Sequence, residues 1–330
     1  MLKLIKVSLL TVGLFIIIFG FFSAVFAQDI EEEVIPDETI IAQEIEEYIA
    51  LDEMITAQDL EITEPKILPD SPFYFLKRWQ RGIKSFFTFN SVKKAELNLR
   101  YGSEKLLEMR KLVQKTDKTE IIEKAAVNYQ KAIEKIKSGV DKIKEKAGEN
   151  KTVENFLDKF TKHQIFHDRV LEKVENQVPS QAAERIREVR EKQFEKFGEV
   201  INKLMNKEEI RERLEKTFRE IKGSGFKDFK NLEILRKLEE KVPQDIKEKI
   251  TEVRENTLNR LKEQLKEMSV QGQEKFRIYT EKIQGKAMGK IEALKDIQSK
   301  LIEWPEIKQR IKNAQEKILE RVKEKAGIKK

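Results

Sequence analysis

Cysteine is absent from this chain of 330 residues, and its absence excludes several classes of protein. A cysteine-free chain has no disulfide framework, no thiol nucleophile and no cysteine-based zinc site. It also cannot carry the N-terminal lipid anchor of a lipoprotein, since that lipid is attached to a cysteine. The alternation of apolar and polar residues that is typical of strands is missing too. What remains is rich in the helix formers Glu, Lys, Leu, Ile, Ala and Arg.

Helix-breaking residues are scarce, with 7 prolines and 13 glycines. Beyond residue 72 the prolines are Pro179, Pro243 and Pro305, at intervals of 64 and 62 residues. The sequence around the first two repeats as well: LEKVENQVPSQAAERIREVRE begins at Leu171, and LRKLEEKVPQDIKEKITEVRE begins at Leu235. Proline interrupts a helix, and a fixed period indicates stacked units. We therefore predict proline-punctuated helical repeats over residues 179–330.

Charged side chains make up 38% of the chain, against about 25% in an ordinary domain. In residues 120–147 apolar side chains recur every three or four positions, which predicts an amphipathic helix. We predict an all-α fold of long amphipathic helices, in which a helical module of unknown function at 66–178 precedes helical-hairpin or coiled-coil-like repeats. The predicted helices are 38–50, 73–89, 91–115, 120–147, 151–178, 180–206, 208–222, 226–241, 244–268, 272–303 and 306–326.

The first 27 residues have the pattern of an export signal. Lys3 and Lys6 precede an uncharged apolar run, and the sequence AVFA ends at Ala27. This pattern predicts a signal peptide cleaved after Ala27, or an N-terminal anchor that spans the membrane with residues 7–26. Both alternatives place the rest of the chain outside the cytoplasmic membrane. They argue against ATP-driven chemistry and against an intracellular nucleic-acid partner.

Charge is distributed unevenly along the chain. Residues 28–65 hold 14 acidic and no basic residues, so the body from residue 66 keeps 59 − 14 = 45 acids and 66 − 2 = 64 bases, a formal +19. The acidic segment is either a solvated spacer or an arm that docks on the basic body. The body could bind an anionic cell-envelope polymer, anionic lipid headgroups or extracellular DNA. However, alternating charges along helices are typical of a solvated face.

Seven aromatic residues are concentrated between Phe73 and Phe89. Leu76, Trp79, Ile83 and Phe87 follow helical spacing there, with basic residues between them. Because aromatic side chains bury the largest areas, we expect this helix to form the nucleus of the first bundle. The alternative is a basic amphipathic helix that lies in a membrane interface.

Two segments of the chain, one of which overlaps this aromatic helix, carry a family resemblance. ILPDSPFYFLKRW, which begins at Ile67, and KHQIFHDRVLEKV, which begins at Lys162, resemble the opening and closing motifs of an uncharacterised bacterial family of exported or membrane-tethered proteins, the domain-of-unknown-function 5667 family. The resemblance covers about residues 67–200. It implies an all-helical extracytoplasmic module, and it supplies no activity or catalytic residue to transfer.

The two histidines of the chain, His163 and His167, are spaced i, i+4 in HQIFH. This spacing could provide half of a zinc site, with Asp168 or Glu172 as a further ligand. The metalloprotease motif HExxH, however, needs a glutamate where this chain has Gln164. We expect the pair to lie at a helix–helix boundary, where its replacement changes neither metal content nor stability.

These patterns predict an exported, non-enzymatic structural or interaction protein of the bacterial cell envelope. We assign no catalytic, cofactor-binding or metal-ligating residue and no cofactor. The partner is unknown: an anionic envelope polymer, a membrane surface, or a protein bound through the repeats. The alternative function is a cell-surface polyanion or lipid-surface binder, and a remote one is a metal-dependent hydrolase at His163 and His167.

Overall fold

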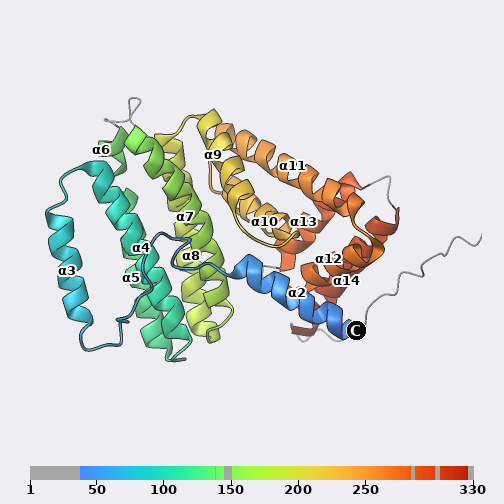
Figure 1. Ribbon diagram of the computed structural model, residues 1–330, viewed down its shortest axis with the longest axis horizontal. Helices are drawn as coiled ribbons and strands as arrows, with labels where there is room; N and C mark the ends of the chain where they lie inside the picture. The colour runs from blue at the N-terminus through green and yellow to red at the C-terminus, as the bar shows by residue number, and fades with distance from the viewer. Residues whose placement is uncertain (1–37, 138, 145–150, 284–286, 302–304, 326–330) are drawn as a thin grey trace, which may run out of the picture. The chain divides into compact units, whose positions relative to one another are not determined.

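Helix is the regular secondary structure throughout the described part of the chain, and no strand occurs there (Figure 1). The computed structural model describes residues 38–137, 139–144, 151–283, 287–301 and 305–325. The predicted all-α fold is therefore confirmed. The helices are α2 (Glu38–Glu53), α3 (Tyr74–Phe86), α4 (Ser91–Val113), α5 (Thr119–Lys137), α6 (Val140–Lys144), α7 (Lys151–Glu175), α8 (Ser180–Leu204), α9 (Lys207–Glu220), α10 (Lys227–Glu239), α11 (Gln244–Glu267), α12 (Val270–Lys282), α13 (Ala287–Lys300) and α14 (Pro305–Lys325).

The three prolines beyond residue 72 stand where helices begin. Pro179 and Pro243 are the N-caps of α8 and α11, with ψ angles of 152° and 157°, and Pro305 is the first residue of α14. Proline fits these positions because the first turn of a helix needs no N–H from it. The prediction that prolines punctuate the helical array is confirmed.

Two predicted helices are interrupted. The helix predicted at 120–147 is divided into α5 and α6 near Gly139, a residue type that weakens a helix interior. The helix predicted at 272–303 ends at Ile283, whose ψ of 143° is extended. There the Lys290 ammonium donates to the carbonyls of Thr280 and Glu281, at 3.3 and 3.4 Å. A tertiary contact thus satisfies the end of α12, which periodicity alone does not reveal.

Four helices close into a ring around the main core. α4 packs on α5, α5 on α8, α8 on α7, and α7 on α4. Leu106, Tyr129, Phe160 and Phe197, one from each helix, are fully buried inside. The helix that follows Pro179 therefore completes the bundle that begins before it.

The remaining helices extend the packing from this ring. α9 and α10 pack on α11, α13 packs on α10, and α14 contacts both α12 and α13. The described residues from Ala42 onward form one compact unit, and the described residues before Ala42 are the first turn of α2.

The sequence repeat is also a structural repeat. Arg190 of α8 donates to Glu175 at 3.4 Å, and Arg254 of α11 donates to Glu239 at 2.9 Å. In both cases the chain turns at a proline between the two partners. The same ion pair therefore ties each pair of helices together.

The acidic segment lies against the body from Ala42 onward. Ile45, Ile55 and Leu60 are buried. Carboxylates of the segment pair with lysines of the body: Glu44 with Lys275 at 2.7 Å, Glu61 with Lys159 at 2.8 Å and Glu64 with Lys111 at 2.6 Å. Residues 42–65 are thus a docked arm rather than a solvated spacer, while residues 28–37 lie outside the described residues.

Candidate functional site

The two histidines of α7 belong to a hydrogen-bonded network inside the four-helix ring. The Ser103 Oγ of α4 lies 3.2 Å from His163 Nδ1 and 2.9 Å from His167 Nε2, and Tyr129 Oη lies 3.0 Å from His167 Nδ1. Ser103 also donates to the Leu99 carbonyl at 3.2 Å. Since a hydroxyl has one proton, both histidines donate to Ser103 when all these bonds form. The second nitrogen of His163, Nε2, is then an acceptor, and it has no partner among the described residues.

Burial keeps both imidazoles uncharged. It lowers the pKa of His163 to about 4 and the pKa of His167 well below its ordinary value. The described residues contain no group of three or more side chains able to hold a metal ion. The pair does lie at the boundary where α7 packs on α4, as expected from the sequence.

Asp168 and Glu172, the residues considered as further zinc ligands, belong to a different cluster. Arg190 donates to Asp168 and, at 2.6 Å, to Glu172. Lys230 of α10 also pairs with Glu172, and Lys237 lies 3.7 Å from Asp168. These carboxylates are therefore engaged with cations of α8 and α10.

This buried ion cluster is fully compensated. Glu233 is 4% exposed, and burial opposes its charge, but Lys230 and Lys237 lower its pKa to about 2. Buried charges of this kind require such partners to remain ionised. We assign the cluster a structural role, because each carboxylate is paired with a cation: Asp168 and Glu172 with cations of α8 and α10, and Glu233 with cations of its own helix.

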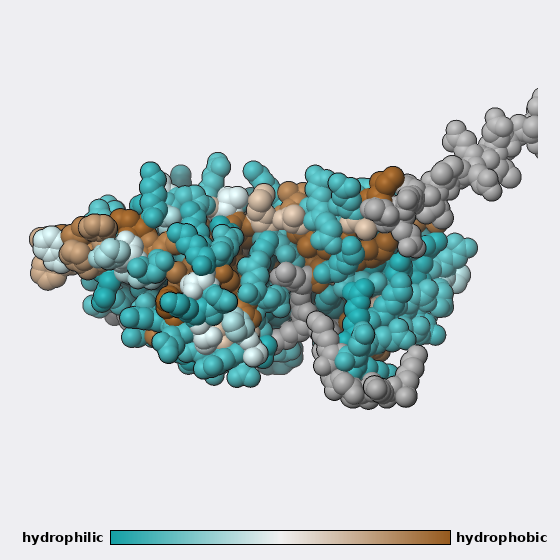
Figure 2. Space-filling model, turned by 90° about the horizontal axis from the view of Figure 1, so that it is seen from below, coloured by the Kyte–Doolittle hydropathy of each residue, from teal (hydrophilic) through white to brown (hydrophobic). Residues whose placement is uncertain are grey.

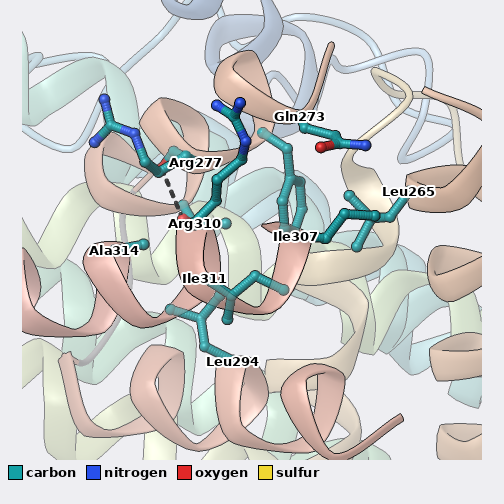
Figure 3. Close-up of a pocket in the computed structure, with 10 residues that line it drawn as sticks. Leu265, Gln273, Arg277, Leu294, Ile307, Arg310, Ile311 and Ala314 are labelled. Carbon is teal, nitrogen blue, oxygen red and sulfur yellow. Dashed lines mark hydrogen bonds between the residues drawn. The ribbon is translucent and has the colours of Figure 1, made fainter. Parts of the chain in front are cut away.

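One small cavity lies between α11, α12, α13 and α14. Figure 3 shows Leu265, Leu294, Ile307 and Ile311 around it. Its volume is about 10 Å³, which is room for about one water molecule. A substrate does not fit there.

A larger groove runs beside the end of α3. It has a volume of about 440 Å³, within the range of small-molecule sites. We call it the α3–α4 groove. It is lined by Leu60, Glu61, Lys84, Thr88, Lys93, Glu96, Leu97, Leu99, Arg100, Lys159 and His163.

The helix α3 turns its apolar side to the solvent. Trp79 and Phe86 are 70% and 72% exposed. We call the set of exposed apolar residues the aromatic face. It consists of Phe73, Phe75, Leu76, Trp79, Ile83, Phe86, Phe87 and Phe89. Figure 2 shows hydrophobic residues gathered at the left, where Figure 1 places α3.

The opposite side of α3 is polar and holds the helix in place. Tyr74, Lys77 and Arg81 follow one another at three- or four-residue spacing and all reach the buried Glu108 of α4, at 2.6, 2.6 and 2.7 Å. Burial and Glu108 raise the pKa of Tyr74 to about 12, so its hydroxyl stays a donor. Arg81 also donates to Glu104 at 2.7 Å. α3 is therefore attached by its charged side.

The expectation that the aromatic helix forms the nucleus of the first bundle is wrong. The spacing of Leu76, Trp79 and Ile83 correctly indicates a helix with one apolar face, but that face is outside. The sequence signal that could have shown this is Glu108, an acid on the otherwise apolar side of α4 that needs donors. The interface-helix alternative agrees with the exposure.

Comparison with known proteins assigns no activity. The family DUF5667, a domain of unknown function, matches residues 66–329. The match thus continues through the repeats, beyond residue 200 where the resemblance was expected to end. No curated protein matches. A solved structure titled "Computational Design of Self-Assembling Cyclic Protein Homooligomers" is similar at 13% identity over 87% of this chain and 96% of that chain, with a TM-score of 0.32. That score is too low to carry an argument.

Proposed function

Since the chain belongs to the DUF5667 family, a domain of unknown function, we propose its role from its own surface. It is an exported, non-enzymatic protein that binds the surface of an anionic membrane through the aromatic face of α3. The observation that carries this proposal is the orientation of α3, which turns its charged side chains toward α4 and its aromatic side chains toward the solvent.

The chemistry of α3 favours a membrane over a protein partner. Residues 71–90 contain no acidic residue, while Arg78 and Lys84 flank the aromatic face. Basic residues beside aromatic ones are typical of helices that lie in the headgroup region of an anionic bilayer. Tryptophan is favoured at this depth, because its ring combines an apolar body with a polar N–H.

The energy available is sufficient for peripheral binding. Full burial of a side chain of this size is worth about 1.5–3 kcal/mol. The residues of the aromatic face are between 43% and 85% exposed, so partial insertion of all eight stabilises the bound state by several kcal/mol. Because Glu108 already fixes α3, little conformational entropy is lost on binding.

The location is supported by sequence. Residues 1–27 carry the export pattern, although they lie outside the described residues. None of the described helices is long and apolar enough to cross a membrane. The exposed aromatic face makes α3 an element suited to contact with a membrane surface.

The test is vesicle binding by the full chain. We expect it to sediment with vesicles that contain phosphatidylglycerol, less with phosphatidylcholine, and less at high salt. Trp79→Ser with Phe86→Ser should weaken binding at least about tenfold, since each tenfold step is about 1.4 kcal/mol. The unfolding midpoint of this variant should stay unchanged, because both rings are exposed.

A matched control removes exposed apolar residues elsewhere. Val270 and Leu319 are both 41% exposed, and Val270→Ser with Leu319→Ser should bind as the wild type does. Trp304→Phe leaves Trp79 as the single tryptophan, whose emission should shift to the blue with anionic vesicles. Loss of a dimer in the Trp79→Ser/Phe86→Ser variant, without any vesicle binding by the wild type, would instead assign the face to a second copy.

A further inference from the structure

The α3–α4 groove places cationic side chains beside the aromatic face, together with a histidine whose Nε2 has no partner among the described residues. We propose that this groove binds a polyol phosphate, a phosphate ester that also carries hydroxyl groups, such as the glycerol phosphate of a lipid headgroup. The inference rests on the proposed function, because the groove borders the end of α3 that would meet the membrane.

The groove contains more cationic than anionic side chains. Lys84 and Lys93 have no ion-pair partner among the described residues. Lys159 is shared with Glu61, and Arg100 with Glu104 at 3.3 Å. The lining also contains Glu96, so four cations stand against the carboxylates of Glu61, Glu96 and Glu104, and 4 − 3 leaves a formal +1. This charge attracts a phosphate group.

The first turn of α4 adds to this preference. Asn90 caps the helix by accepting from the Lys93 backbone N–H at 3.0 Å, so Lys93 lies in that turn. The positive end of the helix dipole therefore lies on the same side as the two free lysines. The C-terminal end of α3, where Lys84 lies, has the opposite dipole, so the preference for a phosphate rests mainly on the side chains.

The buried wall of the groove selects for a hydroxyl. His163 lines the groove, is 4% exposed, and has no partner for its Nε2 within the described part of the chain. With Nδ1 donating to Ser103, this nitrogen offers a lone pair. A buried acceptor without a donor is destabilising. Because this nitrogen has almost no solvent-accessible surface, a ligand hydroxyl reaches it after a small rotation of the ring and then supplies the donor. A phosphate alone leaves this position unused.

The decisive measurement uses the full chain labelled with ¹⁵N-histidine. The chain has two histidines, so its ring spectrum is simple, and His167, fully bonded inside the core, is an internal reference. We expect sn-glycerol 3-phosphate to shift the ring signals of His163 saturably and to leave those of His167 in place. Inorganic phosphate should bind more weakly and shift the Nε2 signal less.

Variants locate the effect. Lys84→Glu with Lys93→Glu should weaken glycerol phosphate binding at least tenfold. Lys247→Glu with Lys323→Glu makes the same charge change at exposed lysines of α11 and α14 and should bind as the wild type does. Equal affinity of both variants, or an unmoved His163 signal, would overturn the groove site. An identical response to inorganic phosphate would overturn the role of the hydroxyl.

Vesicles distinguish the source of the ligand. If the headgroup is the ligand, Lys84→Glu/Lys93→Glu abolishes the preference for phosphatidylglycerol over phosphatidylserine, which has the same charge but no glycerol headgroup. If only soluble glycerol phosphate responds, the groove site stands with a free or polymeric polyol phosphate as ligand. Vesicle binding that depends on Trp79 but not on the lysines, together with a His163 signal that glycerol phosphate does not move, overturns this inference and leaves the proposed function intact. A His163 response to glycerol phosphate without any vesicle binding overturns the proposed function and leaves the groove site intact.

Discussion

At the scale of single residues, the core of the bundle is specified by hydrogen-bond valence as much as by apolar packing. Ser103 can satisfy Leu99, His163 and His167 together only when it donates to the carbonyl and accepts from both rings. Its neighbour Gly102 allows the close approach, because a Cβ there would lie 3.1 Å from the side chain of Ile133. The hydroxyl of Ser103 thus sets how α4 meets α7, and the missing side chain of Gly102 sets how α4 meets α5.

The buried histidines predict acid sensitivity. The pKa of His163 is about 4 in the folded state and 6.5 when unfolded, so the unfolded chain binds more protons between these values. Stability is therefore full above pH 6.5 and falls as the pH drops toward 4. For His163 the loss is about 3 kcal/mol. Urea midpoints between pH 7.5 and 4.5 measure it.

His163→Gln serves as the comparison, since its side chain does not titrate. Its stability should depend less on pH across this window, although it is lower at pH 7.5 because the contact with Ser103 changes. Parallel curves for the variant and the wild type would show that His163 does not titrate on unfolding. The sequence-based expectation that replacing the histidines leaves stability unchanged is not what a buried, bonded pair predicts.

At the scale of elements, the same repeat position has different surroundings in each copy. Arg190 is buried among Asp168, Glu172 and Glu175, whereas the side chain of Arg254 is 16% exposed beside Glu239 and Asp296. The repeated EVRE motif places both arginines alike on their helices. Only the packing of α10 against α7 and α8 decides that the first becomes the centre of a buried cluster.

Methionine replacement at both positions tests this difference. Arg190→Met should destabilise the chain by about 3–5 kcal/mol, because it leaves buried carboxylates without their cation. Arg254→Met should cost about 1 kcal/mol, since water can reach its partners. Chemical denaturation measures both, and equal losses would contradict the assignment of burial.

α3 illustrates how an element can be predicted while its role is not. The periodicity of its apolar residues predicted a helix and one apolar face. Which face turns inward depended on Glu108, a residue of another helix that recruits Tyr74, Lys77 and Arg81. The desolvation cost of that carboxylate is offset only by these donors, so the aromatic residues are left outside.

At the scale of the whole molecule, the docked arm connects distant parts of the compact unit. The carboxylate of Asp52 accepts from the Ser224 hydroxyl at 2.7 Å and from the Tyr279 hydroxyl, and Arg169 donates to the Asp52 carbonyl at 3.0 Å. α2, α7 and α12 thus meet at one buried acid. A fragment that begins at residue 66 loses this contact, so it is not a neutral truncation.

Asp52→Ala should therefore destabilise the full chain by about 3 kcal/mol, since it leaves the hydroxyls of Ser224 and Tyr279 buried without an acceptor. Glu46→Ala is the control, because Glu46 is 65% exposed in its pair with Lys282 and should change stability little. Thermal unfolding of both variants measures the difference. A midpoint for Asp52→Ala equal to that of the control would show that the arm is not held by this acid.

By itself the sequence determined the all-α fold, most helix boundaries, and the repeat marked by Pro179 and Pro243, because these depend on local periodicity and on residues that break helices. The tertiary structure decided which side of α3 is exposed, that residues 42–65 dock, and that His163 and His167 meet Ser103. Each of these depends on a buried polar group that pairs with a residue far away in the sequence. The spacing of residues within one helix does not identify that distant partner.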